Sequence, residues 1–309
     1  MTKFEKSYQY KDVPYTYDVL EKEISQLKKK YSFLTVMVIG KSVEKRNLYL
    51  LKLGTGKRKI FICGGTHGCE WITVPVLMRW TLEICQLYSC RGQAYGRDIT
   101  ELFERATIYI VPMVNPDGIE LQIKGLDSNH KNYKDLLKWN NDNEDFSKWK
   151  ANIRGVDLNR NFNAKWEECK HVEQELGITE PWFEFYSGPW PESEPETFAL
   201  ANFTRHQSFD MVLSYHTQGR VIYWTFDNIH ISEAKAMGEK LSRVSGYELD
   251  TPDISASYGG YKDWFIQEFR RPGYTIECGF GENPLPMDQF DDIYNENREL
   301  LLVAAWGKE

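Results

Sequence analysis

Residues 59–88, KIFICGGTHGCEWITVPVLMRWTLEICQLY, join a short apolar run to a longer one through a glycine-rich turn. The first run, Lys59–Cys63, has the length and the apolar side chains of a buried strand. The second run, Trp71–Tyr88, is apolar on most sides and predicts a buried helix. His67 and Glu70 lie between them. The stretch therefore predicts a strand that passes into a helix at a point carrying polar, chemically active side chains.

The rest of the chain continues this alternation of strands and helices. Strands are predicted at Phe33–Ile39, Leu48–Leu53, Thr107–Val114, Met211–Tyr215, Arg220–Thr225 and Tyr274–Cys278. Helices are predicted at Tyr15–Tyr31, Glu196–His206, Ser232–Ser245, Lys262–Phe269 and Asn295–Ala305. Such alternation indicates an α/β fold with helices on both faces of one sheet. We expect residues 1–309 to form a single domain.

Three connecting segments carry expectations of their own. Asn115–Gly118, with the sequence NPDG, predicts a turn. Ser193 and Glu196 have the spacing of a capping box in which Ser193 begins the next helix. The polar stretch Asp127–Lys148 predicts one long surface loop, and loops of that length are often functional or mobile.

Composition excludes several classes of protein. With 41% hydrophobic and 27% charged residues, the 309-residue chain has the balance of a globular protein that buries a large core. Its formal net charge of −7 and the lack of a dense Lys/Arg block disfavour nucleic acid and anionic membranes as partners. No apolar run reaches the roughly 18 residues that would indicate a membrane span.

The cysteines and the N-terminus indicate a compartment. Six cysteines are too few for a disulfide-stapled scaffold of this length, and none forms a C-x-x-C pair. The first ten residues, MTKFEKSYQY, have no apolar stretch of the kind found in signal peptides. We therefore expect reduced thiols and a cytoplasmic protein.

Two histidines and a glutamate have the pattern of a metal site. His67 and Glu70 stand three residues apart, a spacing that lets an imidazole nitrogen and a carboxylate oxygen reach one ion. His216 ends the predicted strand Met211–Tyr215. Two histidines and one glutamate are a ligand set that leaves zinc an open position for water. Taken alone, the His67–Glu70 pair is also compatible with a surface histidine and glutamate. His216 alone is also compatible with a hydrogen-bonded histidine in the core or at its rim.

Further polar residues complete a candidate site. Glu277 lies near the end of an apolar strand, where a buried carboxylate is costly unless it is paired or functional. Asn159 and Arg160 offer an amide donor and a guanidinium fork, which suit a carboxylate. Asp157 is placed to accept the N–H of a metal-bound imidazole. A structural salt bridge and a polar turn are the simpler interpretations of the same residues.

Taken together and in order, these elements resemble the zinc metallocarboxypeptidases of the carboxypeptidase A type. The resemblance runs from about Tyr15 to the C-terminus and rests on six separate elements. They are His67-x-x-Glu70, Asn115–Gly118, Asp157-x-Asn159-Arg160-Asn161-Phe162, Ser193–Thr197, His216 and Glu277.

The resemblance implies a fold and a set of roles. The fold would be a mixed, mostly parallel eight-stranded sheet between helices, with one zinc ion per chain held by His67, Glu70 and His216. Asp157 would orient His67, and Glu277 would be the general base. Asn159 and Arg160 would hold a substrate carboxylate.

A cation must also stabilise the oxyanion of the reaction. Most of the family uses an arginine upstream of the Asn-Arg pair. Here Lys150 stands in the corresponding position, and Arg154 lies nearby as the alternative. We favour Lys150.

Two positions depart from the digestive members of the family. Where those enzymes carry a mobile tyrosine, four residues before a Gly-Gly pair, this chain has Ser255, and Tyr258 directly precedes the pair. The specificity-pocket position, two residues after that pair, is Lys262. An uncompensated ammonium there would favour a substrate with a second carboxylate, such as meso-diaminopimelate. The alternative is that Lys262 points from its helix into solvent.

Several stretches look most like the bacterial branch of the family that cleaves γ-D-glutamyl-L-diamino acid bonds in cell-wall peptides. They include Trp149–Asn152, Gly155–Phe162 and Gly259–Gln267. With no cell-wall-binding module and no pro-segment in the sequence, we expect an enzyme acting on free muropeptides or other small peptides during recycling or sporulation. The alternatives are a carboxypeptidase that releases acidic C-terminal residues, and an inactive zinc- or peptide-binding protein on the same fold.

Overall fold

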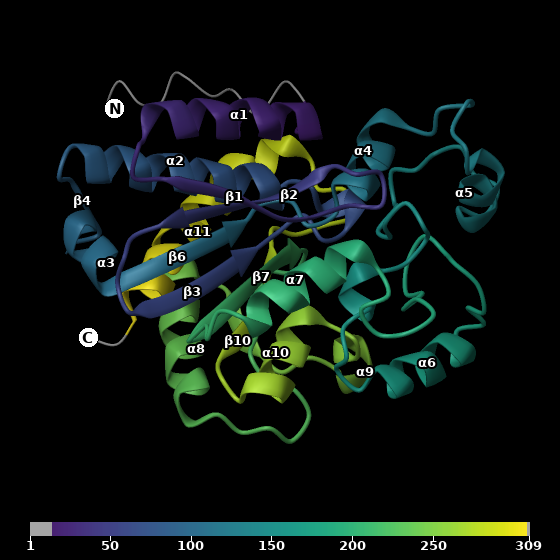
Figure 1. Ribbon diagram of the computed structural model, residues 1–309. Coiled ribbons are helices and arrows are strands. Elements are labelled where there is room, and N and C mark those ends of the chain that lie inside the picture. The colour runs from purple at the N-terminus through teal and green to yellow at the C-terminus, as the bar shows by residue number, and fades with distance from the viewer. Residues whose placement is uncertain (1–13, 308–309) are drawn as a thin grey trace.

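The computed structural model describes residues 14–307, which are arranged around one eight-stranded sheet (Figure 1). The strands are β1 (Thr35–Lys41), β2 (Asn47–Leu53), β3 (Arg58–Cys63), β6 (Ala106–Val111), β7 (Met211–Thr217), β8 (Val221–Tyr223), β9 (Glu248–Asp250) and β10 (Gly273–Cys278). Their spatial order is β1-β2-β6-β3-β7-β10-β8-β9. The four central strands, β6, β3, β7 and β10, are mutually parallel, and β1, β2 and β8 add antiparallel pairs. The predicted mixed, mostly parallel sheet is confirmed.

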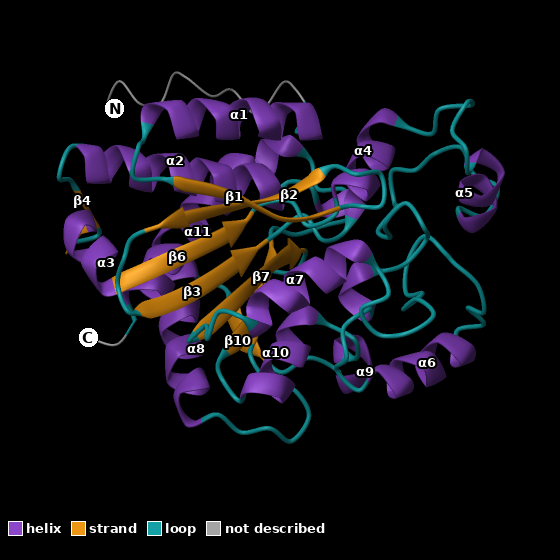
Figure 2. Ribbon diagram, viewed as in Figure 1, coloured by secondary structure: helices purple, strands orange, loops and turns teal. Residues whose placement is uncertain are grey.

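Helices cover both faces of this sheet, as Figure 2 shows. The longer ones are α1 (Tyr17–Lys30), α2 (Thr73–Ser89), α4 (Pro116–Lys124), α6 (Trp166–Glu175), α7 (Pro195–Arg205), α8 (Ser232–Ser245), α10 (Tyr261–Phe269) and α11 (Phe290–Trp306). Shorter elements are α3 (Ile99–Arg105), α5 (Tyr133–Trp139), α9 (Ile254–Ser257), a two-stranded ribbon of β4 (Gln93–Ala94) and β5 (Arg97–Asp98), and the 3-10 turns η2 (Gly68–Glu70), η3 (Leu158–Arg160) and η4 (Met287–Gln289).

Alternation along the central strands divides the core into two layers. In β3, Ile60 and Ile62 belong to the layer shared with α1, α2, α3, α8 and α11, whereas Phe61 and Cys63 belong to the layer shared with α7 and α10. Successive side chains of a strand point to opposite faces, so a strand that is apolar at every position must be covered on both sides. The continuous apolar runs in the sequence are thus explained.

Two local predictions were wrong. Asn115–Gly118 is a helix start rather than a turn, because the Asn115 side chain accepts the Gly118 N–H at 2.9 Å and Pro116 occupies the first helical position. Ser193 does not cap α7; the N-cap position is Glu194, and its side chain makes no capping bond. The carboxylate of Glu196 is drawn instead to the backbone N–H of Val43 at 3.0 Å.

The long polar stretch Asp127–Lys148 is more ordered than predicted. It contains α5, and its buried residues Leu136 and Phe146 pack with Trp149 in a third, smaller apolar cluster. A few apolar residues among many polar ones are enough to anchor the segment. The stretch leads directly into Lys150, so this anchoring fixes one wall of the site described next.

Candidate active site

The carboxyl ends of three neighbouring parallel strands bring the candidate residues together. Strands β3, β7 and β10 are adjacent in the sheet, and Glu277 of β10 stands opposite His216 of β7. The segment after β3 carries His67 and Glu70 to the same edge, with the help of Gly65, whose φ of +60° few other residues adopt. The edge of an open α/β sheet where strands end is the usual place for a site.

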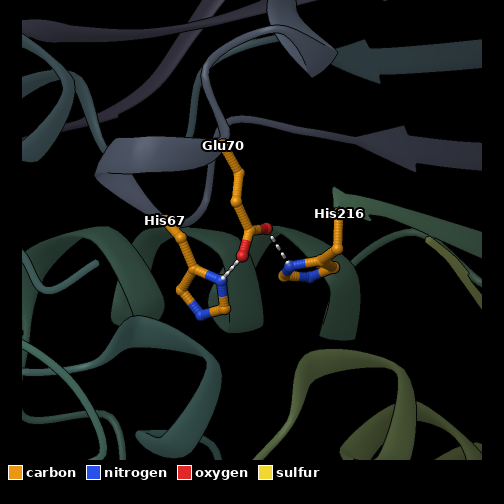
Figure 3. A group of neighbouring side chains, drawn as sticks. All are labelled: His67, Glu70 and His216. Carbon is orange, nitrogen blue, oxygen red and sulfur yellow. Dashed lines mark hydrogen bonds and ion pairs between the residues drawn. The ribbon is translucent and has the colours of Figure 1, made fainter. Parts of the chain in front are cut away.

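His67, Glu70 and His216 point toward one another, as Figure 3 shows. The Glu70 carboxylate lies between the two rings, with Oε1 at 2.8 Å from His67 Nδ1 and Oε2 at 3.0 Å from His216 Nδ1. All three residues offer a donor atom, and these atoms lie within 4.8 Å of one another. The three residues predicted as metal ligands are therefore gathered in one place.

The opposite nitrogen of each ring is held by a neighbouring side chain. His67 Nε2 lies 3.1 Å from Asp157 Oδ1, the contact that the sequence predicted, and His216 Nε2 lies 3.1 Å from Ser214 Oγ. Such outer contacts fix the tautomer of a metal-binding imidazole, which leaves both Nδ1 atoms facing the centre. The backbone N–H of Thr217 also donates to Glu70 Oε2 at 3.2 Å.

The charges around this centre favour a cation. Burial lowers the pKa of His67, but the carboxylates of Glu70 and Asp157 outweigh that effect and raise the pKa to about 10. Burial raises the pKa of Glu70, and the two histidines more than reverse this, so that it is held well below its ordinary value. Two imidazole nitrogens and a carboxylate suit zinc, which they bind at about 2.0–2.2 Å. The donor set thus fits one zinc ion.

Glu277 adjoins the triad with an unpaired carboxylate. Within residues 14–307 the carboxylate has no hydrogen-bond partner, and burial together with the Glu70 charge raises its pKa to about 8. A divalent cation held by the triad would lower that pKa again, because an opposite charge favours the ionised form. A carboxylate with such a pKa near neutrality suits proton transfer.

These residues open onto a cavity of about 400 Å³, called the active-site cavity below. Its lining includes the triad and Lys150, Asn159, Arg160, Lys262, Asp263 and Glu277. The amide oxygen of Asn159 accepts the Tyr261 N–H at 3.1 Å, which directs the side chain. Arg160 donates from Nη1 to the carbonyl of Ala256 at 2.5 Å and that of Tyr258 at 3.1 Å. Neutral carbonyls leave the guanidinium charge available to an anionic ligand.

Lys150, not Arg154, lies in the active-site cavity. Its ammonium forms an ion pair with Glu184 Oε2 at 3.0 Å, and the backbone carbonyls of Trp149 and Lys150 accept the N–H groups of Cys69 and Gly68. Arg154 is absent from the cavity lining, its side chain is 51% exposed, and it pairs with Glu194 at 3.5 Å. The geometry therefore leaves Lys150 as the candidate for the oxyanion.

Lys262 departs from both interpretations of the sequence. Its side chain is only 2% exposed, so it is not a surface lysine. Its ammonium is not uncompensated either, because it forms an ion pair with Asp263 and donates to the Thr225 carbonyl at 2.7 Å. Asp263 is the next residue, and a buried ammonium requires such a partner. The lining of the active-site cavity thus carries a positive and a negative charge side by side.

Tyr258 contributes through its backbone. Its carbonyl accepts from Arg160, while its side chain packs against the apolar cluster that includes Phe162 and Trp264. The structure does not place the Tyr258 side chain in the cavity lining.

Several residues at the site were not identified from the sequence. Ser214 had a signal, since it stands two residues before His216 and therefore on the same face of the strand. Asp263, Glu184 and Phe185 had none, because their importance comes from contacts with Lys262, Lys150 and Arg160.

Hydrolytic zinc enzymes bind the metal through two histidines and a glutamate and place a carboxylate beside it. The site at the edge of this mixed α/β sheet has both features. The sequence profile of the zinc carboxypeptidase family matches residues 20–300, and the chain belongs to that family of zinc metallopeptidases. Within residues 14–307, no helix combines the length and apolarity needed to cross a membrane.

Individual relatives support this membership. The chain is 42% identical over 293 residues to gamma-D-glutamyl-L-diamino acid endopeptidase 1 of Lysinibacillus sphaericus, a match covering 94% of this chain and 72% of the relative. It is 34% identical to the uncharacterized protein YqgT of Bacillus subtilis, over 96% of this chain and 78% of that one. The crystal structure of thrombin activatable fibrinolysis inhibitor superposes with a TM-score of 0.73, at 20% identity, over 97% of this chain and 75% of that chain. The last match shows the shared fold.

Proposed function

We propose that this zinc metallopeptidase hydrolyses the bond between γ-D-glutamate and an L-diamino acid in peptidoglycan-derived peptides, with meso-diaminopimelate as the diamino acid. The similarity to gamma-D-glutamyl-L-diamino acid endopeptidase 1 of Lysinibacillus sphaericus supports the choice of this bond. The observation that carries the choice of diamino acid is the buried Lys262–Asp263 pair in the lining of the active-site cavity.

The charges of meso-diaminopimelate match those of the Lys262–Asp263 pair. Its side chain ends in both an ammonium and a carboxylate, whereas lysine ends in an ammonium alone. The Lys262 ammonium has three N–H groups and uses two of them on Asp263 and Thr225, so one remains for a ligand carboxylate. Asp263 supplies the opposite charge for an ammonium. The Lys262–Asp263 pair has no net charge, so it suits the zwitterionic end of diaminopimelate better than the single positive charge of lysine.

The other residues of the cavity divide the remaining work. Asn159 and Arg160 bind the terminal carboxylate of the substrate and so fix which peptide bond lies beside the triad. Glu277 takes up a proton from the attacking water and passes it to the leaving amine. Lys150 donates to the carbonyl oxygen as negative charge develops there. Zinc, when bound by His67, Glu70 and His216, supplies a water of lowered pKa.

The test uses the zinc-loaded protein and two peptides. With L-Ala-γ-D-Glu-meso-diaminopimelate, we expect L-Ala-γ-D-Glu and free diaminopimelate, identified by mass. The comparison peptide ends in an α-linked glutamate and represents a carboxypeptidase for acidic C-termini. Faster release of that glutamate would replace the proposal with the alternative, and no hydrolysis of either peptide would favour a silent binding protein. The cytoplasmic location stays a prediction, which fractionation of cells would test.

A further inference from the structure

The backbone of the segment Phe183–Tyr186 contacts two residues of the candidate active site, Lys150 and Asp157. The carbonyl of Phe183 accepts the N–H of Lys150 at 3.0 Å. The N–H of Phe185 donates to Asp157 Oδ2 at 3.1 Å, and the carbonyl of Tyr186 accepts the Asp157 N–H at 2.7 Å. One short segment therefore connects the residue that carries the oxyanion candidate to the residue that orients His67.

The ring of Phe185 lies close to both Lys150 and Arg160, the two cations in the lining of the active-site cavity. Its centroid is 5.8 Å from Lys150 Nζ and 5.3 Å from Arg160 Cζ. An aromatic face attracts a cation within about 6 Å of its centroid, so one ring attracts both groups. Two like charges on one side of a cavity otherwise repel each other and turn toward solvent. The ring therefore offers one attractive surface to both cations.

The two cations differ in how much other support they have. Lys150 has the carboxylate of Glu184 at 3.0 Å, which offsets its charge. Arg160 donates to the carbonyls of Ala256 and Tyr258, and within residues 14–307 it forms no ion pair that would neutralise it. The Phe185 ring therefore matters more for Arg160 than for Lys150.

The backbone at Phe185 has the strain expected of a position selected for its side chain. Its φ is +65°, a left-handed conformation that non-glycine residues adopt at a cost. Glycine would relieve the strain and remove the ring. The conformation directs the N–H to Asp157 while the ring faces the cations.

We propose that Phe185 is a positioning residue that holds Arg160 and Lys150 at the wall of the active-site cavity, with its ring as the shared support. The inference rests on the proposed roles of these two cations in substrate binding and oxyanion stabilisation. It assigns no contact with the reacting atoms to Phe185. Its effect passes through the cations.

The test compares three variants of the full-length, zinc-loaded protein on the diaminopimelate peptide. Phe185→Leu keeps an apolar side chain and loses the ring, and we expect KM to rise about 5- to 30-fold, with a smaller fall in kcat through Lys150. Phe185→Tyr keeps the ring and should restore KM to within about twofold. Phe198→Leu is the control, because it removes an exposed ring on α7 that lies outside the lining of the active-site cavity. It should leave KM unchanged.

A second readout needs no turnover. In NMR spectra of the arginine side chains, the ring current of Phe185 should shift the Arg160 guanidinium signal, and the shift should disappear in Phe185→Leu and persist in Phe198→Leu. Zinc content should be equal in all variants. An Arg160 signal that is the same in Phe185→Leu as in the wild type, or equal rises in KM for Phe185→Leu and Phe198→Leu, would overturn the inference. Failure of the proposed function would appear separately, as wild-type protein that does not hydrolyse the peptide.

Discussion

At the scale of single residues, Glu277 and Lys150 show how environment assigns a role. Burial and Glu70 raise the pKa of the Glu277 carboxyl to about 8, while Lys150 keeps its positive charge among Glu70, Glu184 and Asp157. Both groups face the same cavity and both hold a proton more tightly than usual, which leaves the Glu277 carboxyl neutral and Lys150 a cation. Each therefore supports a prediction with a distinct chemical signature.

Glu277→Gln should retain zinc and lose most turnover. The amide preserves the shape of the side chain and cannot accept a proton, and general bases contribute about 10²–10⁴-fold to rate. The measurement is kcat together with zinc stoichiometry. Glu248→Gln, an exposed change on β9, serves as the control and should leave kcat unchanged. Near-normal turnover in Glu277→Gln would exclude this residue from the chemistry.

Lys150→Met should reduce kcat far more than Arg154→Met. Loss of one donor to a developing oxyanion typically costs about 10²–10³-fold. Arg154, half exposed and paired with Glu194 outside the cavity, provides the matched control for the loss of a positive charge. Steady-state rates of both variants decide between the two residues, and the reverse order of effects would transfer the role to Arg154.

At the scale of secondary-structure elements, the sequence predicted what lies at strand ends better than what connects them. His67, Glu70 and His216 were identifiable because β3 and β7 are apolar runs and their ends are visible in the pattern of residues. The start of α4 was missed because Asn-Pro-Asp-Gly is equally typical of a turn and of a capped helix. The cap of α7 was misplaced because a contact with Val43, 153 residues away, determines where Glu196 points.

Helix α10 carries the specificity prediction. The wild type should prefer the meso-diaminopimelate peptide to its lysine counterpart by about 10- to 100-fold, as a charge-assisted contact of about 1.5–3 kcal/mol implies. The double variant Lys262→Met with Asp263→Asn removes both charges, so no buried charge is left unpaired, and it should narrow this ratio. Lys235→Met, an exposed change on α8, is the control.

The readout is kcat/KM for both peptides with all three proteins. A peptide in which the distal ammonium of diaminopimelate is replaced by hydrogen should also be slower in the wild type, because it presents a single charge to the ion pair. An unchanged ratio in the double variant would remove Lys262 and Asp263 from substrate recognition.

Helix α7 carries a prediction on stability. Burial and the nearby Asp117 raise the pKa of Glu196 to about 8, from an ordinary value of 4.5. A raised pKa means that the folded state binds the proton more tightly than the unfolded state. The free energy of unfolding should therefore fall as the pH rises from about 4.5 through about 8, by at most about 1.4 kcal/mol per pH unit from this group.

Chemical denaturation of wild type and Glu196→Gln between pH 5 and pH 8 measures this dependence. As the pH rises from 5 to 8, the unfolding free energy of Glu196→Gln should increase relative to that of the wild type, because Gln carries no titrating proton. Glu239→Gln, exposed on α8, should parallel the wild type. A constant difference between wild type and Glu196→Gln would contradict the assignment.

At the scale of the whole molecule, the fold was largely predictable and the electrostatics were not. Alternating strands and helices, with strands apolar at every position, leave few arrangements besides a sheet covered on both faces. In contrast, the contact of Lys262 with the Thr225 carbonyl and the approach of Phe185 to Lys150 and Arg160 depend on how distant segments pack. The periodicity of apolar residues indicates which way the side chains of one element point. It does not indicate which side chain of another element they meet.

The ends of β3 and β7 together build one zinc site, and the zinc content of the protein is the decisive measurement of it. After removal of metal and reloading, the wild type should bind one zinc per chain, because His67, Glu70 and His216 gather three donor atoms around one point. His216→Ala should lose high-affinity zinc, while His206→Ala, at an exposed position after α7, should retain it. Stoichiometric, tightly bound zinc in His216→Ala would contradict the account.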